Sequence, residues 1–148
     1  MTEDLKGKVA FITGAAHGQG RATAIALAKE GVHIAAFDIA QTLAYPGYEL
    51  GSENELHSLK QECESFAVNC LVFTGDVRVD DDIVKAVSKT LDQLKRIDIL
   101  FNNAGICAYG SAHELTEKEW DTMLDIILRK GQNREFLNTE KEGQFCNC

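Results

Sequence analysis

The sequence predicts an α/β fold in which helices cover both faces of a parallel sheet of about four strands. Short apolar runs alternate with stretches of helical period, a pattern typical of successive β-α-β units. Right-handed crossovers between such units give a doubly wound sheet with the strand order 3-2-1-4. The runs are apolar nearly throughout, as expected for strands covered on both faces, and they lie at 8–13, 33–38, 69–77 and 97–103.

Four stretches of helical period separate and follow these runs, at 20–30, 53–66, 80–95 and 115–128. The first should end at Gly31, because glycine commonly follows the last residue of a helix. The fourth should begin at Thr116, with Glu119 completing a capping box. The second helix is predicted to bury one face made of Leu56, Leu59, Cys63 and Phe66. The third, after the acidic run 80–82, is predicted to bury Ile83, Val84, Val87, Leu91 and Leu94.

The composition is that of an ordinary globular domain. The 148 residues are 45% hydrophobic and 26% charged, enough for one domain with its own core. The formal net charge of -8 argues against a nucleic-acid partner, because such binding needs clustered Lys and Arg. No apolar stretch approaches the roughly 20 residues that span a bilayer, and the first residues show no secretory or transit pattern. We therefore expect a cytoplasmic protein with neither a nucleic-acid nor a membrane partner.

Five cysteines are scattered along the chain without the spacing of a zinc site. No C-x-x-C pair or nearby His pair accompanies them. We expect free thiols in a reducing compartment and no metal ion. The cysteines are Cys63, Cys70, Cys107, Cys146 and Cys148.

The segment TGAAHGQG, residues 13–20, joins the first predicted strand to the first predicted helix. Gly14 lets the backbone turn sharply off the strand, Gly18 leaves room for a pyrophosphate, and Gly20 allows close packing of the helix. The helix N-terminus adds unpaired N–H groups and a positive dipole end. A flexible loop is the alternative, which the flanking strand and helix disfavour. We predict nucleotide binding through Gly14, Ala15, His17, Gly18, Gln19 and Gly20.

Asp38 ends the second predicted strand, and Ile39 follows it. A carboxylate at this position can accept hydrogen bonds from both hydroxyls of an adenosine ribose, and it repels a 2′-phosphate. We therefore predict that Asp38 and Ile39 bind the cofactor and that the cofactor is NAD rather than NADP. The alternative is an acidic residue that merely ends a strand.

Together with GDV at 75–77 and NNAG at 102–105, these residues resemble the short-chain dehydrogenase/reductase family, whose fold is Rossmann-like. The motifs follow the family's order over about residues 5–128. The resemblance implies hydride transfer between a nicotinamide and a small-molecule alcohol or carbonyl substrate. The GQG variant and the YPGY insertion in the loop 39–52 are similar to the NAD-using, carveol-dehydrogenase-type subgroup. The resemblance also implies cofactor contacts from Asp76, Val77, Asn103, Ala104 and Gly105.

The family's catalytic groups have no counterpart in these 148 residues. The resemblance implies a catalytic Tyr with a Lys four residues later, because a phenol with a pKa of about 10 is otherwise a poor base. The residues four beyond the three tyrosines, Tyr45, Tyr48 and Tyr109, are Glu49, Ser52 and His113. Ile127 stands where the family has an Asn in the fourth helix. We predict no catalytic residue here and little or no turnover by this chain alone.

Past about residue 128 the chain no longer resembles the family. We predict a dinucleotide-binding part at 1–128 and a polar, non-family tail at 129–148. A frameshift or alternative exon, a shortened non-catalytic protein, and a chain completed by a partner all remain open. Without a fifth strand, 97–103 would be an unpaired edge that favours homo- or hetero-oligomers. A nucleotide-binding or regulatory module that pairs with a full-length relative is the alternative function.

Overall fold

The computed structural model of the chain describes residues 5–43, 47–107, 110–111, 113–129 and 144–147. Strands and helices alternate along these residues, as the sequence predicts. In order they are β1 (Val9–Thr13), α1 (Gly18–Lys29), β2 (His33–Asp38), α2 (Glu53–Glu64), β3 (Cys70–Thr74), α3 (Asp80–Leu94), β4 (Ile99–Asn102), α4 (Glu117–Arg129) and β5 (Gln144–Asn147).

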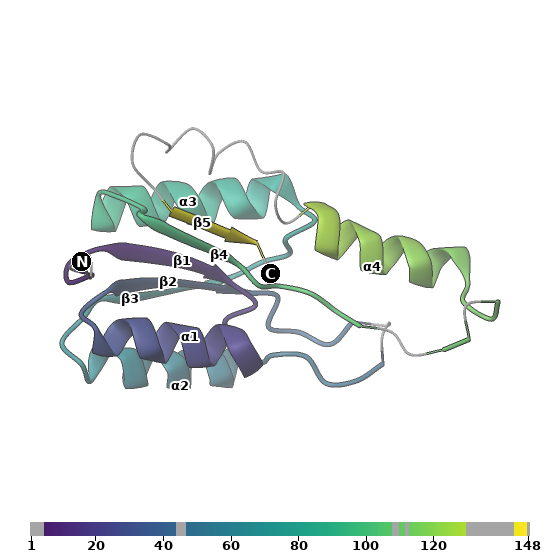
Figure 1. Cartoon of the computed structure of the whole chain (residues 1–148), viewed down its shortest axis with the longest axis horizontal. Helices are drawn as coiled ribbons and strands as arrows, with labels where there is room; N and C mark the ends of the chain where they lie inside the picture. Colours follow the sequence, from purple (N-terminus) through teal and green to yellow (C-terminus); the bar gives the residue numbers. More distant parts are fainter. Residues whose placement is uncertain (1–4, 44–46, 108–109, 112, 130–143, 148) are drawn as a thin grey trace.

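The strands form one parallel sheet in the order β3-β2-β1-β4-β5, which confirms the predicted order 3-2-1-4. Helices α1 and α2 cover one face, α3 covers the other, and α4 lies beyond the carboxyl ends of the strands (Figure 1). At the end of β1, Thr13 pairs with Phe37 of β2 and Asn102 of β4. Three strand ends therefore meet at one edge of the sheet.

A hydrophobic cluster lies on each face of the sheet. Under α1 and α2, Leu56, Leu59 and Cys63 are buried against the strands, as predicted. On the other face, Ile83 and Val87 of α3 pack with residues of β1 and β2. All five residues of β1 are buried, whereas most of β3 is only half-buried because β3 is an edge strand. The expected burial is therefore only partial at β3, and also at β4, where Ile99 and Phe101 are half-buried.

Two predicted core residues, Phe66 and Val84, are exposed. Helix α2 ends at Glu64, so Phe66 leaves the buried face, and the Lys29 ammonium lies 5.6 Å from the centre of its ring. In α3, Ala86 and Thr90 are buried in place of Val84. The Thr90 hydroxyl donates to a backbone carbonyl of its own helix, which satisfies its polar atom in the core.

Two predicted helix ends are confirmed, the C-terminus of α1 and the N-terminus of α4. Gly31 follows α1 with a φ of +84°, in the left-handed region that glycine adopts without strain. At the start of α4, the Glu119 amide donates to the Thr116 hydroxyl at 3.3 Å, and the Thr116 amide donates to the Glu119 carboxylate at 2.8 Å. These reciprocal bonds form the expected capping box.

Strand β5 corrects the prediction of an unpaired edge at β4. Gln144–Asn147 pairs in parallel with Ile99–Asn102, so β4 is an interior strand and β5 is the edge. Four residues with polar ends carry no apolar run, so the sequence pattern could not indicate this strand. The rest of the predicted tail, 130–143 and 148, lies outside the described residues. Among the helices that are described, none is long and apolar enough to cross a membrane.

Candidate functional site

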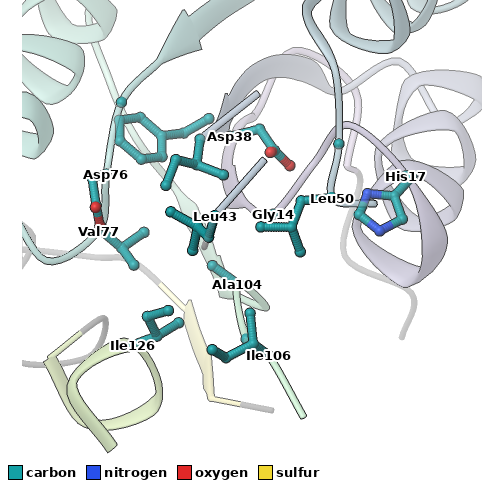
Figure 2. A pocket seen from close by; sticks show the side chains of 15 residues that line it. Gly14, His17, Asp38, Leu43, Leu50, Asp76, Val77, Ala104, Ile106 and Ile126 are labelled. Carbon is teal, nitrogen blue, oxygen red and sulfur yellow. The ribbon is translucent and has the colours of Figure 1, made fainter. Parts of the chain in front are cut away.

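A pocket that is open to solvent lies at the carboxyl ends of the strands. This is the edge at which open α/β sheets bind ligands. Figure 2 shows Asp76 and Val77 on one side of it, His17 on the opposite side, and Ile106 and Ile126 below. Most of the predicted cofactor residues line this pocket, namely Gly14, His17, Asp38, Ile39, Asp76, Val77, Ala104 and Gly105. Ala15, Gly18, Gln19, Gly20 and Asn103 are not among its lining residues.

The three glycines of the turn have different steric surroundings. Gly14 has a φ of +66°, and a Cβ there would lie 2.9 Å from the Ala104 Cα. A Cβ on Gly20 would lie 2.1 Å from the Gly14 carbonyl oxygen, so Gly20 packs against the turn itself. Gly18 has a φ of +57° and open space around it. The first and third glycines are therefore required by packing, and the second by its backbone conformation.

The backbone amides of this turn divide into bonded and available groups. The Ala15 amide donates to the Phe37 carbonyl at 3.2 Å, and the Ala16 amide donates to Asp38 Oδ2 at 2.9 Å. Ala15 is fully buried. Within the described part of the chain, the amides of 18–20 have no acceptor, as expected for the first turn of a helix. The donors available to an anion thus include those of 18–20.

Asp38 connects the glycine turn to the turn that follows β2. Its residue is 4% exposed, and its Oδ1 accepts a hydrogen bond from the Ala40 amide at 3.1 Å. A Cβ on Gly51 would lie 2.9 Å from the same oxygen, so the returning loop passes directly over the carboxylate. Since a carboxylate oxygen accepts about two hydrogen bonds, each oxygen of Asp38 keeps capacity for a ligand hydroxyl.

Asn103 supports the turn from the end of β4. Its side-chain amide donates to the carbonyl oxygens of Thr13 at 3.1 Å and Gly14 at 3.0 Å. The Thr13 hydroxyl accepts in return from the amides of Asn103 and Ala104, both at 3.1 Å. These bonds join the ends of β1 and β4, and they place Ala104 and Gly105 at the pocket.

Asp76 is held by Arg78, a residue that the sequence analysis did not single out. Asp76 Oδ1 accepts from the Arg78 amide at 2.9 Å, and Oδ2 accepts from Nη2 at 2.5 Å. Burial opposes ionisation of Asp76, but the hydrogen bonds and charge of Arg78 outweigh it and hold the pKa of this carboxyl below its usual value. The same ion pair raises the pKa of Arg78. In the sequence, the signal for this ion pair is the pair of opposite charges at positions 76 and 78.

A family model for short chain dehydrogenases matches residues 8–129. The chain belongs to this family. It is 36% identical over 125 residues to (-)-trans-carveol dehydrogenase of Rhodococcus erythropolis, covering 84% of this chain and 45% of that protein. It is 34% identical over 125 residues to the 3-oxoacyl-[acyl-carrier-protein] reductase FabG of Thermotoga maritima, covering 84% and 46%. The chain thus spans less than half the length of these curated relatives.

Solved structures of family members have the same fold. Carveol dehydrogenase from Mycobacterium avium in complex with NAD superposes with a TM-score of 0.90 at 30% identity, covering 97% of this chain and 55% of that one. A short chain dehydrogenase from Mycobacterium paratuberculosis bound to NAD gives a TM-score of 0.89 at 31% identity, covering 96% and 55%. The sequence resemblance to this family, including its carveol-dehydrogenase members, is confirmed.

This short-chain dehydrogenase chain lines its pocket with apolar residues that the sequence analysis did not select. Leu43 and Leu50 come from the loop after β2, Ile106 from the segment after β4, and Ile126 from α4. The Tyr48 hydroxyl accepts a hydrogen bond from the Cys107 amide at 3.0 Å, which ties that loop to the segment after β4. In the sequence, the apolar residues within the loop 39–52 are the signal that could have identified Leu43 and Leu50. Tyr45 and Tyr109 lie outside the described residues.

The cysteines that the structure describes are free. Cys63 and Cys70 are buried in the core, whereas Cys107 is exposed. The side chains of Cys146 and Cys148 lie outside the described part. Among the described residues, no cluster of three His, Cys, Asp or Glu side chains could hold a metal ion.

Proposed function

We propose that this chain binds the adenosine end of NAD in the pocket at the carboxyl ends of β1, β2 and β4. The observation that carries this proposal is that Gly14 and Asp38, predicted from two separate features of the sequence, and Asp76, implied by the family resemblance, line one pocket. The NAD-bound state of two solved family members supports it. The bound cofactor would supply the hydride acceptor or donor of the family's reaction.

Each part of the pocket suits one part of the nucleotide. The amides of 18–20 and the positive end of α1 suit the pyrophosphate, and Gly18 leaves that approach open. The Asp38 carboxylate suits the ribose hydroxyls, and its buried charge would oppose a 2′-phosphate, so we propose NAD over NADP. Val77, Leu43 and Ile106 provide apolar walls for the adenine. Ala104 and Gly105 border the nicotinamide side.

We propose that the whole enzyme transfers hydride between the nicotinamide and a small-molecule alcohol or carbonyl. The sequence of this chain contains no Tyr-x-x-x-Lys, so its own residues bind and orient the cofactor but supply no phenolic acid or base. We therefore propose little or no turnover by this chain alone. We further propose that 1–128 form the dinucleotide-binding part, that 129–148 form a non-family tail that contributes β5, and that the protein is cytoplasmic.

The missing Tyr-x-x-x-Lys also favours a second candidate function, a non-catalytic nucleotide-binding or regulatory module. A module of this kind would bind AMP or NAD without turnover and would form a defined complex with a full-length relative. Steady NADH formation from NAD and a panel of secondary alcohols would exclude it and would also refute the proposed lack of turnover.

Titration of the chain with AMP, NAD and adenosine 2′,5′-bisphosphate tests the proposed cofactor site. We expect AMP and NAD to shift the amide resonances of 18–20, with the bisphosphate binding about tenfold more weakly than AMP. Asp38→Asn should narrow that difference, because it removes the charge that opposes the 2′-phosphate. Asp92→Asn, the same change at an exposed position of α3, should leave it intact. Unchanged resonances at millimolar AMP and NAD would refute the proposal.

A further inference from the structure

Strand β3 forms one edge of the sheet, so half of its backbone hydrogen-bonding groups point away from the other strands. The bonds to β2 show which half this is. The Ile34 amide donates to the Asn69 carbonyl at 2.9 Å, and the Gly75 amide donates to the Asp38 carbonyl at 2.9 Å. Along a parallel strand the direction of these groups alternates from residue to residue. The odd-numbered residues from 69 to 75 therefore face β2, and the even-numbered residues face outward.

Only part of this outward edge is available to a partner. The Cys70 carbonyl accepts a hydrogen bond from Lys60 Nζ of α2 at 2.7 Å, which occupies the first outward position. Among the described residues, none bonds to the outward backbone groups of Val72 or Thr74. Each of these two residues presents one N–H and one C=O, which is what a strand added to a sheet edge requires. The open edge of the sheet is therefore 72–74.

A groove lies between this open edge and α3. Val72, Phe73 and Thr74 line it from the strand, and Lys85 and Lys89 are among the residues that line it from the helix. Both lysines are exposed, and in the described part of the chain neither forms an ion pair. The backbone edge and the two positive charges thus face the same space.

Asp82 also lines the groove, but its carboxylate is engaged elsewhere. Its Oδ2 accepts a hydrogen bond from the Asp76 amide at 3.0 Å, in the turn that follows β3. With two lysines against one aspartate, the charged residues that line the groove carry a net positive charge. The groove therefore suits a ligand that brings both a peptide backbone and negative charge.

We propose that the open edge 72–74 binds an extended acidic segment of a partner protein, which joins the sheet as a further strand beside β3. Main-chain hydrogen bonds to Val72 and Thr74 hold the segment, and Lys85 and Lys89 select its charge. Phe73 packs with the hydrophobic cluster under α3, so the side chains of the added strand on that face lie beside the two lysines.

The spacing of the lysines defines the sequence that the edge accepts. Alternate residues of an extended segment share one face and are about 6.6 Å apart. Lys85 and Lys89 are four residues apart on a helix, which is about 6 Å along its axis. Carboxylates on alternate residues therefore reach both lysines. The residue between them points to the opposite face, where Val72 packs against the other hydrophobic cluster, so an apolar side chain fits there.

A second copy of this chain is the competing occupant of the edge. Antiparallel pairing of β3 with β3 would place both α3 helices on the same face of a continuous sheet, with Lys85 and Lys89 of the two copies close together. Like charges oppose that arrangement, and lysines near sheet edges commonly prevent such pairing. Strand β3 itself, CLVFT, has no acidic residue to offer. The charge of the groove therefore favours an acidic segment over a second copy.

The test titrates the full chain with capped peptides and follows its backbone amides by NMR. A peptide with the repeat Glu-Val-Glu is the probe, Lys-Val-Lys reverses its charge, and glutarate supplies two carboxylates without a peptide backbone. We expect the probe to bind at least about tenfold more tightly than either control. On binding, the Val72 and Thr74 amides should exchange with solvent about tenfold more slowly. The Phe73 amide, which faces β2, should change little.

Two kinds of variant separate the charge from the backbone. Lys85→Gln and Lys89→Gln should each weaken probe binding by about threefold, whereas Lys118→Gln, the same change on the exposed surface of α4, should leave it unchanged. Val72→Pro removes an outward N–H at a sheet edge, where proline is tolerated, and should weaken binding by about tenfold. Thermal unfolding of each variant checks that it folds.

The inference has several ways to fail. Glutarate that bound as tightly as the probe would show an anion site without strand addition. Unchanged exchange of the Val72 and Thr74 amides, or full affinity in both lysine variants, would also overturn it. Protection of these amides that rose with protein concentration in the absence of peptide would assign the edge to a second copy and refute the acidic segment.

Discussion

The first turn of α1 lies directly against the residue that leaves β1: a Cβ on Gly20 would come 2.1 Å from the carbonyl oxygen of Gly14. The same Cβ would come 2.7 Å from the Asn103 side-chain nitrogen, which itself donates to the Gly14 oxygen. Helix α1, the end of β1 and the end of β4 therefore converge on one carbonyl group. This convergence fixes the helix N-terminus at the edge of the sheet where the pocket opens.

Gly20→Ala is expected to destabilise the fold by about 3 kcal/mol, because the methyl group collides with backbone that cannot move freely. Gly18→Ala is the matched control. Its Cβ has nothing within 4 Å, and its φ of +57° carries a cost of about 1 kcal/mol. Urea unfolding of the two variants measures both effects. An equal loss in the two variants would show that the helix can shift away from the turn.

Asn103→Asp is expected to reduce the free energy of unfolding by about 3 kcal/mol. The substitution replaces a donor that bonds to the Thr13 and Gly14 carbonyls with an acceptor that repels both. Asn69→Asp adds the same charge at an exposed residue whose backbone alone makes the observed bonds, and it should cost little. Denaturant midpoints at pH 7 measure the difference. Similar midpoints for the two variants would mean that the Asn103 amide is not a principal link between β1 and β4.

The Asp76–Arg78 pair predicts a pH dependence of stability. Because the pKa of Asp76 is lowered by folding, its contribution is present above the unfolded pKa of about 3.9 and is lost as pH falls through the folded value. The free energy of unfolding of the wild type should therefore exceed that of Arg78→Gln by about 2 kcal/mol at pH 7. This difference should shrink below about pH 4. Asp82 and Asp125 face the pair in both proteins.

Urea unfolding between pH 3 and pH 7 measures the difference in free energy of unfolding between the wild type and Arg78→Gln. Lys118→Gln removes an equal charge from the exposed surface of α4 and should show a small difference from wild type at every pH. A wild-type advantage over Arg78→Gln that grew as the pH fell would contradict the assigned direction of the Asp76 shift.

The parts of this fold that depend on local sequence pattern could be predicted from the sequence alone. Buried β1 is an unbroken apolar run, and the Thr116–Glu119 capping box follows from two residue types at fixed spacing. Strand β5 was not predicted, because a short polar segment becomes a strand through backbone pairing with β4 rather than through its own side chains. Phe66 was wrongly predicted to be buried, because the end of a helix depends on its last few backbone hydrogen bonds. The spacing of apolar residues gives no information about those bonds.

The same distinction applies to the candidate site. Gly14 and Asp38 were predictable because each meets a steric or charge requirement, whereas Asp76 was expected only from the family resemblance carried by GDV at 75–77. Leu43, Leu50 and Ile126 reach the pocket from a long loop and a distant helix, and their positions depend on tertiary packing. Whether the Ala15 and Ala16 amides are hydrogen-bonded depends on where β2 ends. The sequence alone therefore could not distinguish these two bonded amides from the amides of 18–20.

The Tyr48 hydroxyl, which accepts from the Cys107 amide, provides a test of how the loop after β2 is held at the pocket. Tyr48→Phe keeps the ring and removes the acceptor, so the Cys107 amide should exchange its hydrogen with solvent about tenfold faster. Global stability should fall by less than about 1 kcal/mol, because both residues are exposed. Hydrogen exchange followed residue by residue measures this, with the Asp98 amide, which donates to the Val9 carbonyl at 2.8 Å within the sheet, as an internal reference. If the Cys107 amide exchanged at the wild-type rate, the loop would be held by the Leu43 and Leu50 contacts with the pocket rather than by this hydrogen bond.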